Sequence, residues 1–284
     1  MPLPLSLETL RALFRESIDC RDEILYPSRE DPDQRAARTW SPLARDNPVA
    51  AAAASPSADP MVKFPSWVRQ HFDDGIENLL DAGCGYGRLS IPLLEEHPRL
   101  TVLGIDASDV MLAGFRRLAR ERGVSERVLL YCGNLVRLPL EDGCFDAALS
   151  SAVLLHLPYP EVESVVGELH RVLKRGGKLV LAGSFPNLYT PEGLQNFLYA
   201  RLRPAANGPV RPYTRRQVEK LVTRFRSFDI LVHGLTVFPR SLASMSLPFG
   251  DAFQEYNRRM TDRHLARFSS RQLFVSHYDV VAVK

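Results

Sequence analysis

Residues 78–94 read NLLDAGCGYGRLSIPLL, and this stretch decides the fold. An apolar run ends at Asp81, three glycines follow at alternate positions (Gly83, Gly85 and Gly87), and a helical pattern begins after the last of them. Glycine lets the backbone turn sharply and approach a ligand closely, because it has no Cβ. The stretch therefore predicts a strand, a tight loop that can hold a ligand, and a helix.

The spacing of these glycines bears on the kind of ligand. A dinucleotide-binding loop has the pattern GxGxxG and holds a pyrophosphate at the helix N-terminus. Here the pattern is GxGxG, and the carboxylate of Asp81 precedes it. A carboxylate repels a pyrophosphate and attracts a cationic amino acid group. The loop favours a cofactor that carries such a group, and a turn that binds another nucleotide is the alternative.

Short apolar runs and helical patterns alternate through the rest of the chain. Strands are predicted at residues 76–80, 101–105, 128–132, 145–150 and 178–182, and helices at 87–96, 109–122 and 161–173. After residue 184 the sequence predicts a helix over 214–225, a strand over 228–237, a helix over 251–268 and a last strand over 273–283. This alternation is typical of an α/β fold with a parallel sheet and helices on both faces.

Two motifs at the start of this region resemble those of the class I S-adenosylmethionine-dependent methyltransferases. Residues 81–87, DAGCGYG, match the first motif of that family, a strand that ends in an acid followed by GxGxG. Residues 103–108, LGIDAS, supply the second, an acid at the end of the next strand. That acid, Asp106, lies nineteen residues after Gly87.

Three further motifs follow in the order of the family. Residues 133–139, GNLVRLP, match the third motif with Asn134 in place of the usual Asp. Residues 145–146, FD, and residues 168–177, ELHRVLKRGG, match the fourth and fifth, with Arg175 in place of a proline. The resemblance covers about residues 64–237 and the last strand, and is nearest to the branch with ubiquinone, menaquinone and natural-product methyltransferases. It implies a Rossmann-like, seven-stranded, mostly parallel sheet, S-adenosylmethionine as cofactor, and methyl transfer.

The resemblance also implies which residues meet the cofactor. Asp106 would accept hydrogen bonds from both ribose hydroxyls, and Asn134 would bind the adenine amino group through its side-chain oxygen, with a role in loop structure alone as the alternative. The implied cofactor-binding residues are Asp81, Gly83, Cys84, Gly85, Gly87, Asp106, Ala107, Met111, Asn134, Leu135 and Ser151. Cys84 is expected to fit the loop as a small residue and not to act as a nucleophile. His156, after the fourth strand where methyl acceptors enter, is the candidate general base, and the alternative is a histidine without a base role, as many members of this branch carry here.

Segments outside the sheet are expected to select the acceptor. The predicted organisation is an N-terminal helical extension and linker over residues 1–63, a candidate cap, and a methyltransferase domain over 64–284. The helix of the extension is expected over residues 6–18, and the linker includes the proline-rich stretch 41–65. The domain carries insertions at residues 185–212 and 238–271, which are rich in aromatic and aliphatic residues. Such a composition favours a small organic acceptor with apolar parts.

Charge is distributed unevenly along the chain. The net charge is +3, but the segment from residue 200 onward contains 15 Lys and Arg against 6 Asp and Glu. This excess fits an anionic substrate, an acidic partner or an RNA backbone. Because the sequence contains no recognisable RNA-binding module, a small-molecule methyltransferase is the first interpretation. An RNA or protein methyltransferase is the second, and a non-catalytic S-adenosylmethionine-binding protein is the third.

Cysteine spacing and hydropathy indicate the compartment. The cysteines at positions 20, 84, 132 and 144 form no CxxC pair, so the sequence predicts neither a metal site nor a disulfide framework. No run approaches 18 apolar residues, and the first residues lack the basic start of a signal peptide. We therefore expect a cytoplasmic protein that does not insert into a membrane. The acceptor and the oligomeric state stay open.

Overall fold

The computed structural model describes residues 12–28, 66–202, 210–235, 237, 255–257, 259–260 and 275–284. The chain forms two compact units. The first comprises Met1–Ser150, Ser164–Val180 and Val283–Lys284, and the second comprises Ser151–Glu163 and Leu181–Ala282. Each is described in turn.

The first unit contains most of the sheet. Its strands are β1 (Ile18–Arg21), β2 (Ile24–Pro27), β3 (Asn78–Ala82), β4 (Thr101–Asp106), β5 (Val128–Cys132), β6 (Phe145–Ser151) and the first part of β7 (Leu173–Pro186). They are hydrogen-bonded in the order β1-β2-β5-β4-β3-β6-β7. β3 pairs in parallel with β4 and β6, and β5 pairs in parallel with β4 and β2. The carboxyl ends of these strands therefore lie at one edge of the sheet.

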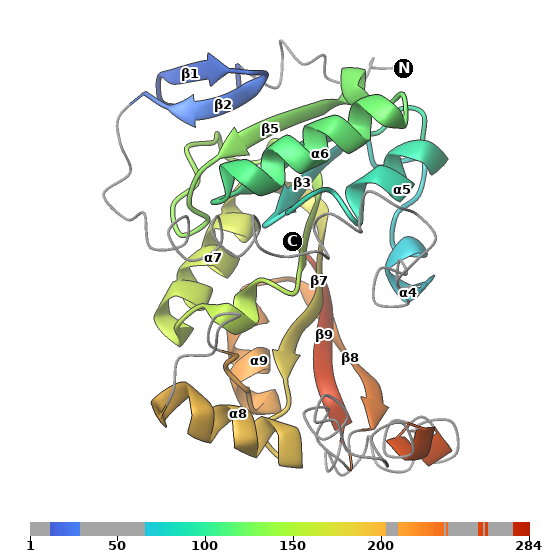
Figure 1. The fold of residues 1–284 in the computed structure, drawn as a ribbon, viewed down its shortest axis with the longest axis vertical. Coiled ribbons are helices and arrows are strands. Elements are labelled where there is room, and N and C mark those ends of the chain that lie inside the picture. The colour runs from blue at the N-terminus through green and yellow to red at the C-terminus, as the bar shows by residue number, and fades with distance from the viewer. Residues whose placement is uncertain are drawn as a thin grey trace. The chain divides into compact units, whose positions relative to one another are not determined.

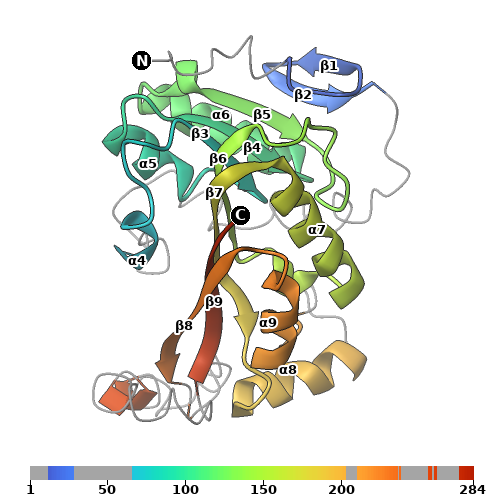
Figure 2. The ribbon, with the colours of Figure 1, turned by 180° about the vertical axis from the view of Figure 1, so that it is seen from behind.

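Helices cover both faces of this sheet, which explains why its strands are continuously apolar. The helices are α4 (Ser66–Arg69), α5 (Ser90–Glu96), α6 (Asp109–Glu121), the short η2 (Ser125–Arg127) and the second half of α7 (Tyr159–Val172). Figure 1 shows α5 and α6 in front of the strands, and Figure 2, from behind, shows α7 on the viewer's side. Every residue of β3 is buried, as expected for a strand with helices on both sides.

The N-terminal residues differ from the prediction. Residues 12–18 are not helical, and Ile18 opens β1, which forms an antiparallel hairpin with β2. Phe14 forms an antiparallel bridge with Leu140, so pairing with a distant segment overrides the local helical pattern. The predicted helix over residues 6–18 is therefore wrong in its described part. Residues 6–11 and the linker at 41–65 lie outside the described residues.

The second unit contains the rest of β7, β8 (Ser227–Leu235) and most of β9 (Val275–Val283), in the order β7-β9-β8. Its helices are η3 (Leu154–His156), the start of α7, α8 (Pro191–Leu202) and α9 (Arg215–Val222). α8 occupies part of the predicted irregular insertion at 185–212, where a whole helix was missed. Asn187, fully buried, joins this region to β9 because its side-chain amide donates to the Val275 carbonyl at 3.0 Å.

The predicted fold class is confirmed, with a different strand count. Within the described residues the sheet is mostly parallel and has nine strands, of which β1 and β2 extend the expected seven. Residues 255–257 and 259–260 are helical, as predicted, and the rest of the 238–271 insertion lies outside the described residues. Among the described residues, no helix has the length and apolar character that crossing a membrane requires.

Candidate functional site

The predicted cofactor-binding residues of the first unit gather at the carboxyl edge of the sheet. Register places Asp81 opposite Gly104 in β4, and Asp106 opposite Cys132 in β5. The loops that follow β3, β4 and β5 therefore start side by side. In open α/β sheets, ligands bind outside this edge.

The glycine loop is held onto β4 by backbone hydrogen bonds. The N–H groups of Gly83 and Cys84 both donate to the Ile105 carbonyl, at 2.7 and 3.1 Å. The Gly85 N–H donates to Asp106 Oδ2 at 2.9 Å. Gly85 has a φ of +54°, and a Cβ at this position would meet no atom within 4 Å. The loop thus presents an open side next to a carboxylate, and a side chain would fill that space.

Gly87 closes the loop for a packing reason. Its φ is +82°, and a Cβ here would lie 2.4 Å from the ring of Phe115 in α6. Phe115 is fully buried, so the ring has no room to move away. Glycine at this position lets α6 pack closely against the loop.

Asp106 is held by the backbone on two sides. Its Oδ2 accepts the Gly85 N–H, and its Oδ1 accepts the Ser108 N–H at 2.9 Å. Burial raises the pKa of Asp106, and the hydrogen bonds from Ser108, Gly85 and Ala107 oppose that rise. Since each carboxylate oxygen has two lone pairs, both oxygens keep capacity for a ligand hydroxyl.

Asp81 lies deeper than Asp106. It is 3% exposed, and its Oδ2 accepts a hydrogen bond from the Ser90 hydroxyl at 2.6 Å. Burial raises the pKa of Asp81 to about 7; Asp106 adds to the rise, and Ser90 and Arg88 oppose it. A carboxyl group with a pKa near 7 loses its proton readily when a cation approaches, because the cation stabilises the carboxylate.

The remaining predicted residues of this unit lie in the loops after β4 and β5. Met111 donates its N–H to the Ser108 hydroxyl at 3.3 Å, in the first turn of α6. Asn134 accepts the Val136 N–H on its side-chain oxygen at 3.0 Å, which shapes the loop after β5, and Leu135 is buried. The Ala107 carbonyl lies 3.8 Å from Cys132 Sγ.

Cys84 is buried within the glycine loop. Its Sγ would lie 2.9 Å from a Cβ placed on Gly104, so the thiol fills the space over that glycine. Burial raises the pKa of Cys84 well above its usual value. A thiol in this state is a poor nucleophile.

Ser151 and His156 belong to the second unit. Ser151 ends β6, and His156 ends η3, where its N–H donates to the Val153 carbonyl at 3.0 Å. The next residue after β6, Ala152, has a φ of +55°, and its N–H donates to the Ala182 carbonyl at 2.9 Å. The chain therefore turns sharply between the two predicted residues.

A histidine–aspartate pair in the second unit was missed by sequence reasoning. His277 Nε2 lies 3.5 Å from Asp279 Oδ2, and the other oxygen of Asp279 accepts the Gly183 N–H at 2.6 Å. The Asp279 side chain is 1% exposed and that of His277 27%. The two residues are two positions apart on β9, a spacing that any strand contains, so the sequence carried no specific signal for this pair.

Sequence reasoning also did not predict that the end of β2 lies at the carboxyl edge of the sheet. Leu25 pairs with Tyr131 in the parallel register of β2 and β5, so Tyr26 follows at the level of Cys132. Burial raises the pKa of Tyr26, and the nearby Cys132 and Asp109 add to that rise. The Asp22-Glu23 turn that makes this hairpin is not one of the usual two-residue hairpin sequences, which explains the omission.

These groups fit S-adenosylmethionine. The carboxylate of Asp106 suits a pair of ribose hydroxyls, and the open side of Gly85 leaves space beside that carboxylate. The buried carboxyl of Asp81 suits a cationic amino acid group.

Comparison with known proteins points the same way. A family described as a methyltransferase domain matches residues 79–177. A demethylmenaquinone methyltransferase of Thermus thermophilus is 35% identical over 137 residues, which are 47% of this chain and 59% of that relative. The chain therefore spans less than two thirds of the relative's length.

Two solved structures share the fold. The 4+2 cyclase SpnF has a TM-score of 0.57 and 21% identity, with coverage of 88% of this chain and 96% of that one. The geranyl diphosphate C-methyltransferase of Streptomyces coelicolor, solved with Mg²⁺, geranyl diphosphate and S-adenosyl-L-homocysteine, has a TM-score of 0.55 and 19% identity, with coverage of 91% and 99%. Residues 79–177 of the chain thus match a methyltransferase domain, and the chain shares the fold of these two solved structures.

Proposed function

We propose that this protein is a transferase that moves the methyl group of S-adenosylmethionine to an O, N or C atom of a small organic molecule with apolar parts. The observation that carries the proposal is the hydrogen bond from Gly85 N–H to Asp106 Oδ2, beside the open side of the glycine loop. The names of two similar proteins support the acceptor class, since each names a small organic molecule, and geranyl diphosphate joins an apolar geranyl chain to an anionic diphosphate.

The proposed cofactor contacts divide among the three loops at the carboxyl edge. Asp81 and the glycine loop (Gly83, Cys84, Gly85 and Gly87) hold the amino acid part, Asp106 accepts the ribose hydroxyls, and Asn134 accepts the adenine amino group. The proposed set of cofactor-binding residues is completed by Ala107, Met111, Leu135 and Ser151. When bound, the cofactor supplies an electrophilic methyl group on its sulfonium. The protein then has to orient the acceptor and exclude water.

An O or N acceptor that loses a proton needs a base, and two histidines are candidates. His156 lies in η3, after the strand that ends in Ser151. His277 has a buried carboxylate, Asp279, within 3.5 Å of Nε2, and such a partner orients an imidazole. We keep His156 as the first candidate and add His277 on this observation.

The segments outside the sheet are proposed to select the acceptor. These are the N-terminal part over residues 1–63 and the insertions at 185–212 and 238–271 of a methyltransferase domain over 64–284. Within the second unit, α8 exposes apolar side chains, with Leu194 at 55% and Leu198 at 48%. A cytoplasmic location is part of the proposal, because the four cysteines are widely spaced and form no CxxC pair.

An RNA or protein acceptor is the weaker alternative. Two cations of α9 have carboxylate partners in the same unit: Arg215 Nε lies 2.9 Å from Glu219, and Lys220 Nζ lies 3.1 Å from Glu163. Part of the C-terminal basic excess is thus neutralised locally. An S-adenosylmethionine-binding protein without transferase activity is the other alternative, since SpnF, which shares the fold, is named a cyclase and not a methyltransferase.

Calorimetry with S-adenosyl-L-homocysteine tests the cofactor site. We expect binding to the wild type and a loss of at least about tenfold in Asp106→Ala, because charge-assisted hydrogen bonds to the ribose are removed. Asp109→Ala is the matched control, since it removes an exposed carboxylate three residues away. Tight binding of NADH, or equal affinity in both variants, would contradict the proposal.

Incubation with methyl-labelled S-adenosylmethionine and a cell extract identifies the acceptor. A labelled small molecule is expected, whereas label only in RNA or protein would favour the second interpretation, and no label in any fraction the third. With the acceptor known, His156→Ala and His277→Asn are compared with the wild type. Loss of turnover with cofactor binding retained marks the base.

A further inference from the structure

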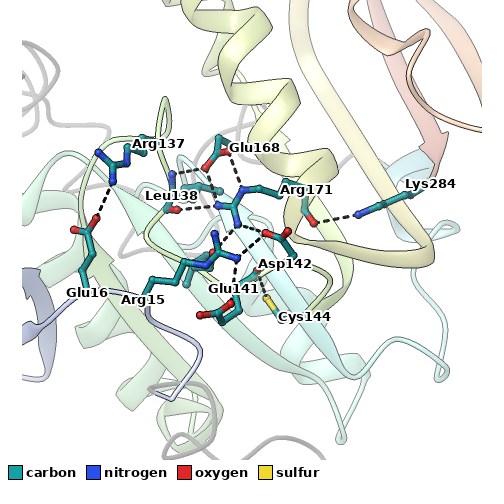
Figure 3. Close-up of polar contacts among 11 residues, drawn as sticks. Arg15, Glu16, Arg137, Leu138, Glu141, Asp142, Cys144, Glu168, Arg171 and Lys284 are labelled. Atoms are coloured by element: carbon teal, nitrogen blue, oxygen red, sulfur yellow. Dashed lines mark hydrogen bonds and ion pairs between the residues drawn. The ribbon is translucent and has the colours of Figure 1, made fainter.

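The loop that follows β5 carries two of the proposed cofactor residues and is fixed at its far end by one arginine. Arg171, in the last turn of α7, donates from Nη2 to the Leu138 carbonyl at 2.9 Å and from Nη1 to the Leu140 carbonyl at 2.6 Å. Nη1 also donates to Asp142 Oδ1 at 2.6 Å. One guanidinium thus holds three points of the segment from residue 138 to residue 142, as Figure 3 shows.

Glu168, one turn earlier in α7, orients this guanidinium. Its Oε1 accepts from Arg171 Nε at 2.9 Å, and its Oε2 accepts from Nη2 at 2.8 Å. The same Oε2 accepts the Leu138 N–H at 2.8 Å, so helix and loop exchange hydrogen bonds in both directions. The Arg171 and Glu168 side chains are only 23% and 21% exposed, so water competes weakly for these bonds.

The N-terminal segment holds the same stretch from another side. The Arg15 N–H donates to the Pro139 carbonyl at 2.9 Å, and the Glu141 N–H donates to the Leu13 carbonyl at 2.9 Å. The Arg15 guanidinium reaches Asp142 Oδ1 at 2.9 Å, the oxygen that Arg171 also uses. Asp142 therefore joins the two arginines (Figure 3).

The position of Asn134 depends on two anchors. Before it, the Gly133 N–H donates to the Asp106 carbonyl at 3.0 Å. After it, the Val136 N–H returns to the Asn134 side chain, and the next bonds to other elements are an exposed one from Arg137 to Glu16, at 3.4 Å, and those of Leu138. A short loop held at both ends presents its side chains in one arrangement, and release of one end adds conformations that binding must remove.

We propose that Arg171, oriented by Glu168 and completed by Asp142 and Arg15, is a positioning residue for the recognition of the adenine base through Asn134. This inference rests on the proposed function, because it assumes that Asn134 meets the adenine amino group. Arg171 itself touches neither the base nor the reacting atoms. Its role is to keep the loop in the arrangement that reads the base.

A comparison of two ligands separates this role from a merely structural one. S-adenosyl-L-homocysteine carries the adenine amino group, and S-inosyl-L-homocysteine carries a carbonyl in its place. A site that hydrogen-bonds the amino group discriminates between them. We expect calorimetry on the wild type to show this preference, and Arg171→Gln to reduce it about tenfold. General loss of stability would weaken both ligands equally and leave the preference unchanged.

The controls use other charged pairs of the same unit. Lys174→Gln removes the partner of Asp146, at 2.5 Å, without touching the loop, so it should lower stability and keep the ligand preference. Arg171→Lys keeps the charge but not the three-point fork, so it should not restore the preference. If Arg171→Gln does not fold, Arg15→Gln replaces it, since loss of this half-exposed guanidinium removes only the outer ion pairs with Asp142 and Glu141. A smaller loss of preference is then expected.

Amide hydrogen exchange gives a second measurement without ligand. In Arg171→Gln, and to a lesser extent in Arg15→Gln, the amides of Val136 and Leu138 should exchange faster, while those of β4 keep their rates. An unchanged ligand preference in the folded variants, or a wild type that binds both ligands equally, overturns the inference. A wild type that binds neither ligand overturns the proposed function itself, so the two failures are distinguishable.

Discussion

At the scale of single residues, the carboxyl group of Asp81 couples the stability of the fold to the cofactor. An aspartate in an unfolded chain has a pKa of about 3.9, whereas Asp81 in the fold has a pKa of about 7. The folded state binds the proton more tightly, so the free energy of unfolding falls as pH rises from about 4 to about 7. Above that range the loss of stability is complete and no longer changes with pH. A cationic group placed beside Asp81 would offset this cost.

Replacement of Asp81 by Asn tests this coupling. Asp81→Asn removes the ionisation without changing the shape, so we expect it to raise the free energy of unfolding by up to about 4 kcal/mol at pH 8 and by almost nothing at pH 4. The same variant should bind S-adenosyl-L-homocysteine more weakly. Urea denaturation at both pH values, with calorimetry at pH 8, measures both effects. An equal change in stability at the two pH values would show that the pKa is not raised.

Gly85 can be tested for ligand contact by comparison with Gly123, whose replacement should affect fold stability alone. Gly85 and Gly123 both have a positive φ, of +54° and +67°, and a Cβ at either position meets no protein atom within 4 Å. Gly85→Ala and Gly123→Ala should each cost about 1–2 kcal/mol of stability, from backbone strain alone. Only Gly85→Ala should lose affinity for S-adenosyl-L-homocysteine, because its methyl group enters the open side of the loop. Comparable affinity in the two variants would show that the cofactor does not bind beside Gly85.

At the scale of secondary-structure elements, the β1-β2 hairpin turns through two residues that are not glycine. Asp22 and Glu23 have φ values of +49° and +62°, in the left-handed region that most residues avoid. Glu23 also forms an ion pair with Arg120 of α6, at 2.5 Å, with 64% of the glutamate side chain exposed. The turn therefore combines backbone strain with a weak, exposed ion pair.

Two substitutions of Glu23 separate these contributions. Glu23→Gln removes the ion pair, and Glu23→Gly removes the pair and the strain together. Because an exposed pair contributes less than about 1 kcal/mol and the strain costs about 1–2 kcal/mol, the glycine variant should be more stable than the glutamine variant by about 1 kcal/mol. Thermal unfolding measures the order of stability of the two variants. The reverse order would show that the turn does not have this strained conformation.

The elements that sequence reasoning predicted correctly are those whose pattern arises locally. Strands β3 to β6 and helices α5 and α6 have continuous apolar runs or helical periodicity, and their bounds were predicted to within three residues. The glycine loop, Asp106 and the loop of Asn134 follow directly from those strand ends. The family resemblance then supplied the roles that geometry alone does not give.

The elements that were missed depend on distant partners. Residues 12–17 look helical, yet Phe14 pairs with Leu140, more than a hundred residues away. The partners of Arg171 are likewise separated from it in sequence, and no periodicity indicates that a helix end will hold the loop after β5. The pair of His277 and Asp279 depends on Gly183 of β7. Contacts of this kind become visible only in the folded chain.

At the scale of the whole molecule, the two units differ in what they contribute to the proposed reaction. Most of the proposed cofactor residues belong to the first unit, and Ser151, His156 and His277 belong to the second. Hydrogen exchange with saturating S-adenosyl-L-homocysteine should protect residues 83–87, 106–111 and 133–136. Protection should also include residues 151–156 and spare α8, since no cofactor residue is proposed there. A ligand effect confined to α8 would contradict the assignment of the site.

The strand order of the second unit also affects how the chain folds. β9 lies between β7 and β8, although β8 comes first in the sequence and about forty residues separate the two. During synthesis, the backbone donors and acceptors of β8 leave the ribosome before the strand that they pair with. Until β9 arrives, this edge is open to non-native partners, which is the state that chaperones recognise and that favours aggregation. Chains interrupted between residues 235 and 275 should therefore be prone to misassembly, even though the cofactor-binding loops are already complete.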